Sequence, residues 1–198
     1  MPSNTNFVVK KGDLFQGARK GSSFAHCISK DVKLGRGISV SFRQRFGNVE
    51  ELRFQNSDVG DISTIMLEKN CFVYNLITKE KFHGKPSYES LEDCLLKMRQ
   101  HAIEHGVREI SCPKLACGLD NLSWAMVSDL IDAIFADTGI KISVFYLHKH
   151  LANDWCVAFW KDLPSNSKKR INHNFIDLVN YVHWVYYILI AVPLALSI

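Results

Sequence analysis

A short turn, Gly118-Leu-Asp120, carries residue types that can bind phosphate and move a proton. It follows an apolar run at residues 107–112 and precedes an apolar helical pattern at 122–137. A strand that ends in a glycine turn before a helix can aim backbone N–H groups at a phosphate. Asp120 adds a carboxylate at the same place, which can serve as an acid or base. The turn indicates a diphosphate cradle, although turns rich in Gly and Asp also occur without function.

Lys79 stands at the end of a second apolar run, residues 72–77. Leu76 and Ile77 would hold the stem of its side chain. A lysine amine becomes nucleophilic when burial or neighbouring cations lower its pKa. A lysine at a strand end is more commonly a solvated surface residue, so the residues alone leave both interpretations open.

Two further segments offer polar groups after apolar strands. Asp13 follows the strand pattern at 7–10, and Gly35 and Gly37 form a turn that opens a helix at Ile38. Glycine suits a backbone that approaches a phosphate closely or takes a positive φ. Ligands of open α/β sheets bind at the carboxyl ends of strands, so one crevice could collect these groups with Lys79 and Asp120.

Other reactive side chains favour structural roles. His26 lies within a strand pattern, where a hydrogen-bonded core histidine is the better interpretation than a base. Cys117 has no partnered histidine in the sequence and is interpreted as loop packing. The six cysteines form no CxxC pair, which favours reduced thiols of an intracellular protein and argues against zinc.

The elements that must position these residues alternate along the chain, which predicts a three-layer α/β/α sandwich. The strongest helix is 88–105, where apolar residues recur at helical spacing, Ser87 offers a cap and Gly106 ends the pattern. Strands are predicted at 7–10, 23–28, 62–68, 71–77, 107–112 and 140–147. Helices are predicted at 37–46, 48–56, 88–105 and 122–137.

The chain divides into a domain at 1–149, a polar linker at 150–174 and an apolar tail at 175–198. The tail just reaches the roughly 20 apolar residues that a bilayer requires. A C-terminal transmembrane anchor, a helix packed on the domain and a segment not native to the fold all remain open. The N-terminus shows no secretory signal, and a net charge of +4 with dispersed basic residues argues against direct nucleic-acid binding.

Taken together, the motifs resemble those of the macrodomain family, and within it the terminal ADP-ribose protein glycohydrolase, or O-acetyl-ADP-ribose deacetylase, subgroup. The resemblance runs in one order from about residue 7 to about residue 147. The matching segments are Lys11-Gly-Asp-Leu-Phe15, Ala25-His-Cys-Ile-Ser29, Gly37-Ile38 with Phe46-Gly47, Leu76-Ile-Thr-Lys79, Lys85-Pro86 with Tyr88-Glu89, and Cys117-Gly-Leu-Asp120. Arg36 departs from the family, which usually has a small residue between the two glycines.

The resemblance implies a mixed central sheet and an ADP-ribose site with Asp13 on the adenine, and no separate cofactor. It also implies that Lys79 is the nucleophile and Asp120 the base. The residues that it assigns to ligand binding are Asp13, Leu14, Ser29, Gly35, Gly37, Ile38, Lys114, Leu115, Ala116, Cys117, Gly118, Leu119 and Leu147.

Two functions follow from this resemblance. The first is a hydrolase that removes mono-ADP-ribose from glutamate or aspartate of proteins and also deacetylates O-acetyl-ADP-ribose. The second is a reader that binds ADP-ribose without cleaving it, and the pairing of Lys79 with Asp120 favours the hydrolase. The partners implied are ADP-ribose and ADP-ribosylated proteins of the nucleus or cytoplasm, with a membrane added if the tail is an anchor.

Overall fold

The computed structural model describes residues 6–147. The expected linker at 150–174 and apolar tail at 175–198 lie outside the described residues, as do the last two positions of the domain expected at 1–149. Within 6–147, none of the helices combines the length and the apolar character that crossing a bilayer would require.

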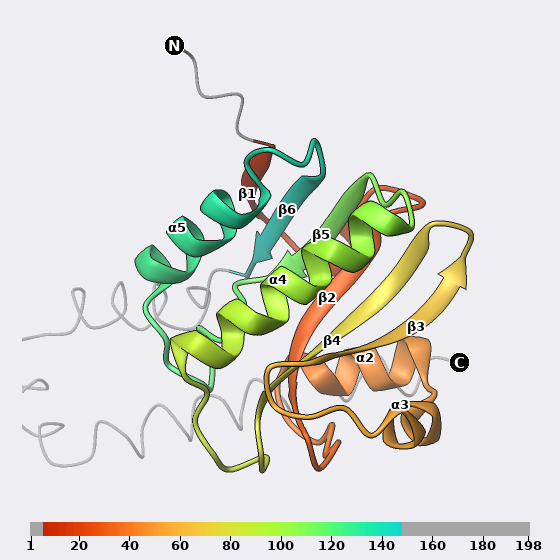
Figure 1. Cartoon of the computed structure of the whole chain (residues 1–198), viewed down its shortest axis with the longest axis vertical. Coiled ribbons are helices and arrows are strands. Elements are labelled where there is room, and N and C mark those ends of the chain that lie inside the picture. The colour runs from red at the N-terminus through yellow and green to blue at the C-terminus, as the bar shows by residue number, and fades with distance from the viewer. Residues whose placement is uncertain (1–5, 148–198) are drawn as a thin grey trace, which may run out of the picture. The chain divides into compact units, whose positions relative to one another are not determined.

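One mixed six-stranded sheet forms the centre of the described residues (Figure 1). Its strand order is β1-β6-β5-β2-β4-β3, and β3 alone runs antiparallel to its neighbour, β4. The strands are β1 Phe7–Lys11, β2 Ser23–Ser29, β3 Ile62–Glu68, β4 Cys71–Lys79, β5 Glu109–Pro113 and β6 Lys141–Tyr146. The five parallel strands therefore end at one edge of the sheet, and the expected mixed sheet is confirmed.

Helices cover both faces of the sheet, which confirms the three-layer prediction (Figure 1). The longer pair, α4 Tyr88–Glu104 and α5 Trp124–Phe135, buries one hydrophobic cluster against the sheet. The opposite face carries α1 Leu14–Gly17, α2 Ile38–Phe46 and α3 Val49–Gln55. Leu14, Phe42 and Leu52 bring these three helices into the second cluster.

Strand β4 is buried along Cys71–Thr78, with only Lys79 partly exposed at its end. A strand between two helical layers is buried on both faces, which explains why residues 71–77 are apolar except for Asn75. The same burial fixes the backbone that presents Lys79 to the edge of the sheet.

The observed elements differ from the predicted ones in two small respects. At the end of α4, Gly106 has φ 61, and the N–H groups of Gly106 and Val107 bond to the carbonyls of Ile103 and Ala102. This Schellman pattern holds Val107 in the helix terminus. Strand β5 therefore begins at Glu109 instead of at residue 107. The four-residue helix α1 was not predicted, because one turn is too short to show a helical period.

Candidate functional site

Lys79 and Asp120 form an ion pair at the carboxyl edge of the sheet. The Lys79 Nζ lies 2.5 Å from Asp120 Oδ1, and the two side chains are 13% and 15% exposed. Lys79 ends β4, and Asp120 lies in the turn after β5. Since β2 lies between β4 and β5, the pair reaches across the end of β2, where Ser29 is the register partner of Lys79.

The thiols beside this pair are held in the protonated form. Burial raises the pKa of Cys27 well above its ordinary value, and the negative charge of Asp120 acts in the same direction. Burial also raises the pKa of Cys117 to about 11, with Lys114 opposing and Asp120 adding to the shift. Cys117 Sγ contacts the Leu115 carbonyl at 3.0 Å. Neither thiol is activated as a nucleophile, since that requires a lowered pKa.

Asp13 caps the N-terminus of α1. Its Oδ1 accepts hydrogen bonds from the N–H groups of Phe15 and Gln16, at 2.9 and 3.0 Å. The second carboxylate oxygen has no partner among the described residues, so one side chain can cap a helix and still accept from a ligand amine. Leu14, the next residue, is buried at 4% exposure.

The first glycine loop, residues 35–37, lies next to the turn that carries Asp120, residues 118–120. Gly37 has φ 60, and a Cβ added there would lie 3.5 Å from Leu119 Cδ1. Ile38 begins α2 directly after it, and Gly35 does not have a positive φ. Arg36 is exposed and has no ion pair among the described residues. The geometry therefore requires glycine at position 37 more than at position 35.

The second glycine-bearing loop, residues 114–118, is anchored in the core. Leu115 and Ala116 are buried, and the Ala116 carbonyl accepts from Leu122 N at 3.0 Å. The positive φ of this loop falls on Ala116, at 52°, and not on Gly118. The Lys114 ammonium lies over two aromatic rings, 4.7 Å from the centroid of the Tyr146 ring and 5.1 Å from the centroid of the Trp124 ring.

The remaining candidates lie at strand ends. Ser29 Oγ lies 2.5 Å from Asp31 Oδ1, to which it donates. Asp31 in turn accepts from Phe82 N at 3.2 Å, just beyond Lys79. Leu147 follows β6 at the same edge of the sheet and is 69% exposed.

Sequence reasoning did not connect Lys85 and Tyr88 with the Asp120 turn. Lys85 Nζ donates to the Leu119 carbonyl at 3.0 Å. Tyr88 accepts a hydrogen bond at its hydroxyl from Ser123 N, also at 3.0 Å. Both residues belong to the segment that resembles the macrodomain family, but nothing in their spacing shows which residues they contact.

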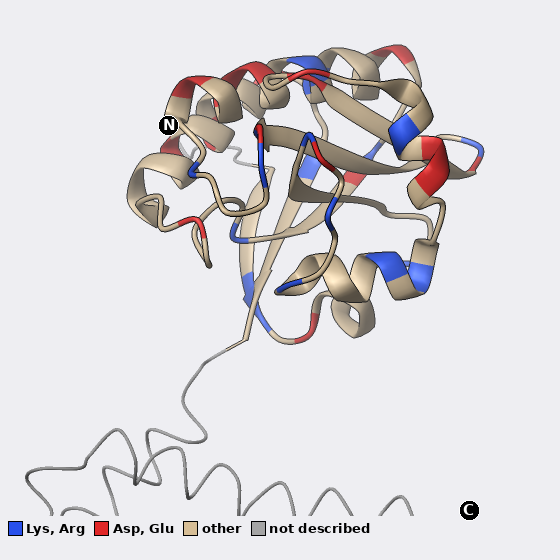
Figure 2. Ribbon diagram, turned by 90° about the horizontal axis from the view of Figure 1, so that it is seen from below, with Lys and Arg blue, Asp and Glu red and all other residues tan. Residues whose placement is uncertain are grey.

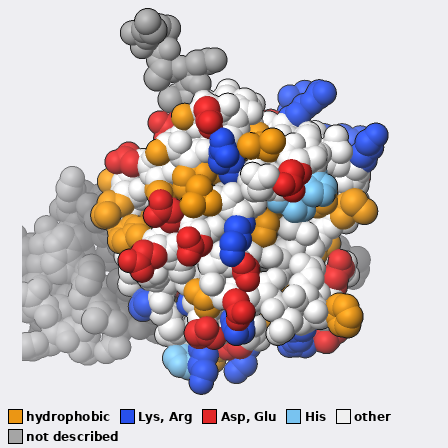
Figure 3. Space-filling view, viewed as in Figure 1, with side chains coloured by type: hydrophobic (Ala, Val, Ile, Leu, Met, Phe, Trp, Pro, Cys, Tyr) orange, Lys and Arg blue, Asp and Glu red, His pale blue; other side chains and the backbone are white. Residues whose placement is uncertain are grey.

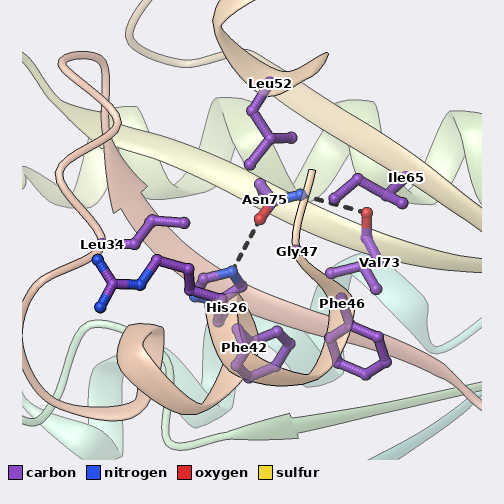
Figure 4. A pocket seen from close by; sticks show the side chains of 10 residues that line it. His26, Leu34, Phe42, Phe46, Gly47, Leu52, Ile65, Val73 and Asn75 are labelled. Atoms are coloured by element: carbon purple, nitrogen blue, oxygen red, sulfur yellow. Dashed lines mark hydrogen bonds between the residues drawn. The ribbon is translucent and has the colours of Figure 1, made fainter. Parts of the chain in front are cut away.

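His26 lies in a small cavity under α2, away from the ion pair (Figure 4). Its Nε2 is 2.8 Å from Asn75 Oδ1, and Asn75 donates its own amide to backbone carbonyls, so Nε2 carries the proton. The ring stacks on Phe42 at 3.8 Å, and Nδ1 has no partner among the described residues. Burial lowers the pKa of His26 to about 4, against the opposing effect of the Asn75 hydrogen bond. The structure thus places His26 in the core.

A second hollow, of about 330 Å³, is lined by Gly35 of the first glycine loop and by residues before the loop and from α2 and α3. Its lining residues are Val32, Lys33, Leu34, Gly35, Arg43, Val49 and Arg53. Neither hollow includes Lys79 or Asp120, which lie where Leu119 and Gly37 approach one another. Among residues 6–147, no three His, Cys, Asp or Glu side chains are grouped so as to hold a metal ion.

Comparison with known proteins matches residues 25–131 to the Macro domain family. A human protein named ADP-ribose glycohydrolase OARD1 is 40% identical over 146 residues, which cover 74% of this chain and 95% of that protein. A bovine protein of the same name is 40% identical over 137 residues, covering 69% of this chain and 89% of that protein.

Solved structures share the fold at lower identity. The macrodomain of Thermus aquaticus DarG has a TM-score of 0.63 at 19% identity, covering 71% of this chain and 97% of its own. Thermosipho africanus DarTG in complex with ADP-ribose has a TM-score of 0.59 at 16% identity, covering 72% of this chain and 42% of its own.

Proposed function

The chain belongs to the macro domain family, and we propose that it is a hydrolase that releases ADP-ribose from ester-linked glutamate or aspartate side chains of proteins. The observation that carries this proposal is the Lys79–Asp120 ion pair at the carboxyl edge of the sheet. A module that only bound ADP-ribose would not need a lysine and a carboxylate in contact beside its glycine loops. The name of the human relative supports the same activity.

The proposed ligand orientation follows from the loops. Asp13 accepts from the adenine amine through its unpaired oxygen, while the two glycine-bearing loops bind the diphosphate. Leu119 and Gly37 already approach one another there, and Ser29 ends β2, the strand between those that lead to Lys79 and Asp120. The distal ribose then lies next to Lys79 and Asp120.

The chemistry proceeds in two steps. The neutral Lys79 amine attacks the anomeric carbon of the distal ribose, so that a C–N bond forms while the C–O bond to the protein carboxylate breaks. Asp120 first takes the ammonium proton of Lys79 across a contact of 2.5 Å and then passes it to the departing carboxylate, so that Asp120 is ionised again before the second step. Water, deprotonated by Asp120, then adds at the same carbon and the C–N bond breaks, which releases ADP-ribose and restores Lys79.

The same site would act on O-acetyl-ADP-ribose, because the bond to be cleaved there is also an ester on the distal ribose. The partners of the protein would be ADP-ribose and ADP-ribosylated proteins of the nucleus or cytoplasm.

The test is release of ADP-ribose from an auto-modified ADP-ribosyltransferase. Wild type should release it, whereas Lys79→Ala and Asp120→Ala should lower kcat by at least about a thousandfold, as loss of a covalent nucleophile or its base does. Both variants should retain most of their ADP-ribose affinity in calorimetry, since neither residue is assigned to the diphosphate or adenine.

Lys97→Ala is the matched control, because it also removes the lysine of a Lys–Asp ion pair, with Asp61, but on α4. It should leave release unchanged. If Lys79→Ala released ADP-ribose at the wild-type rate, the mechanism would be wrong. If wild type bound ADP-ribose and left the label on the protein, the chain would be a reader.

A further inference from the structure

Residues 80–88, which join β4 to the first turn of α4, hold the Asp120 turn from two sides. Lys85 Nζ donates to the carbonyl of Leu119, the residue before Asp120, at 3.0 Å. Ser123, three residues after Asp120, donates its backbone N–H to the Tyr88 hydroxyl, also at 3.0 Å. The two contacts therefore bracket the carboxylate-bearing residue. Figure 2 shows the loops that carry Lys and Arg at this edge of the sheet.

Apart from the Lys79–Asp120 ion pair and the bond from Leu122 N to the Ala116 carbonyl, the Asp120 turn makes few contacts of its own. Its internal backbone contact is a long one, Asn121 N to the Gly118 carbonyl at 3.3 Å, and Asn121 itself has φ 63. Gly118 and Leu119 are exposed, so packing does not fix them. Ser123, at the N-cap of α5, makes no side-chain capping bond. The contacts from Lys85 and Tyr88 thus add to the ion pair in defining where the carboxylate lies.

The segment that supplies both contacts is itself firmly anchored. Ser87 and Ser90 form a capping box at the start of α4, and Ser90 Oγ donates to the Thr78 carbonyl at 2.9 Å. Pro86 is buried, and the Tyr88 ring packs against the core cluster. Thr78 directly precedes Lys79, so the anchor that holds the Asp120 turn is also tied to the lysine of the ion pair.

We infer that Lys85 and Tyr88 are positioning residues that set the Asp120 carboxylate opposite Lys79. This inference rests on the proposed hydrolase activity. The Lys85 contact is the stronger of the two, because an ammonium donor forms a charge-assisted hydrogen bond. The bond from Leu122 N to the Ala116 carbonyl holds the second loop up to Ala116, whereas Gly118 and Leu119 of the same loop belong to the turn. Loosening the turn should therefore impair the chemical step most and weaken nucleotide binding to a smaller extent.

The first experiment separates kcat from affinity. Lys85→Met keeps the length of the side chain and removes the donor. It should lower kcat for ADP-ribose release by about tenfold to a hundredfold, as a displacement of about 1 Å does. The dissociation constant for ADP-ribose should stay within about threefold of wild type. Lys85→Arg, which can still donate to the Leu119 carbonyl, should recover most of kcat.

Tyr88→Phe keeps the packed ring and removes only the hydroxyl. It should lower kcat less than Lys85→Met does, because water can replace the hydroxyl at the exposed Ser123 N–H. Lys81→Ala is the control for loss of a nearby exposed lysine, since its side chain has no partner among residues 6–147. It should leave kcat unchanged.

Hydrogen exchange at Asn121–Ser123 supplies a readout that needs no turnover. Exchange there should be faster in Lys85→Met than in wild type, with no change at the core strand β4. If wild type proved inactive, the proposed hydrolase would fail, while this measurement would still decide whether Lys85 holds the turn.

Three results would overturn the inference. One is wild-type kcat in Lys85→Met, and another is unchanged exchange at the turn. The third is a raised KM with unchanged kcat, which would make Lys85 a direct substrate contact instead of a positioning residue.

Discussion

At the scale of residues, Asp120 meets two requirements of Lys79 through one contact: it compensates the charge of the lysine and it can accept the lysine's proton. A lysine at the end of a buried strand is costly to charge unless a partner compensates it, and Asp120 does so at 2.5 Å. The lysine must lose a proton before it can attack, and the same carboxylate is the nearest acceptor. The contact that stabilises the resting state is thus also the route by which the proposed reaction begins.

His26 gives a prediction on pH. The folded protein holds it neutral down to a pKa of about 4, against an ordinary value of 6.5. The unfolded chain therefore takes up a proton first as pH falls below 6.5, so stability falls between pH 6.5 and 4. From pH 7 to pH 5 this residue alone should cost about 2 kcal/mol.

Urea unfolding of wild type and His26→Gln at pH 7 and pH 5 measures this effect. The variant should lose about 2 kcal/mol less than wild type over that interval, whatever its stability at pH 7. His83→Gln, at an exposed position, is the control and should follow wild type. Equal losses in wild type and His26→Gln would contradict the assignment.

At the scale of elements, the start of α4 links fold and site. Its N-cap, Ser87, accepts from Ser90 N at 3.0 Å, and Ser90 Oγ reaches back to Ser87 N at 3.2 Å. The same helix presents Leu91, Leu95 and Met98 to the core. Proper capping thus orients both the buried face of the helix and the segment that carries Lys85.

Ser87→Ala should destabilise the fold by about 1 kcal/mol, because the Ser90 N–H loses its capping oxygen. Chemical denaturation monitored by circular dichroism measures this loss. The matched control is Ser128→Ala, whose hydroxyl donates to the Ala125 carbonyl within α5. That change should be neutral or slightly stabilising, since alanine is the better residue in a helix interior. An equal loss in both variants would argue against the cap.

Sequence periodicity predicts most of the helices and strands, but it does not predict the side-chain contacts between them. The strands predicted at 62–68 and 71–77 are present as the antiparallel pair β3 and β4. The prediction placed Lys79 and Asp120 at one sheet edge because parallel strands end together. Lys85 could not be connected with Leu119 in that way, because a side chain that reaches a carbonyl leaves no periodic signal.

The positive φ of the second loop was also beyond sequence reasoning. Glycine marks such positions most often, and the prediction therefore emphasised Gly118. The structure places the strained conformation on Ala116, where burial and the bond from Leu122 hold it. Tertiary contacts have overridden the local preference of the residue there.

At the scale of the whole molecule, the two helical layers bury separate clusters on opposite faces of one sheet. On the α4 side, acidic side chains predominate over the left and centre of the surface, with basic side chains among them and at its margins (Figure 3). Cys94 and Cys112 lie inside the cluster under α4 and α5, at 0% and 1% exposure. Because both thiols are buried there, their chemical modification would show that this helical layer has opened.

Labelling of these two thiols should therefore follow global unfolding. Burial keeps reagents away from both thiols in the folded state. It also raises the pKa of each to about 12, so that the reactive thiolate does not form there. Maleimide labelling in rising urea, read by mass spectrometry, should modify both with the midpoint seen by circular dichroism. Modification of either thiol well below that midpoint would indicate that the layer opens separately.

The position of β2 between β4 and β5 determines when, during folding, the proposed catalytic pair can first form. Lys79 and Asp120 are 41 residues apart, and they meet only after an earlier segment has been inserted between the strands that carry them. A partly assembled sheet with β4 and β5 wrongly adjacent, or with β2 excluded, would present both residues and still be inert. Enzymatic activity should therefore return in a single step upon refolding, with no half-active species along the way.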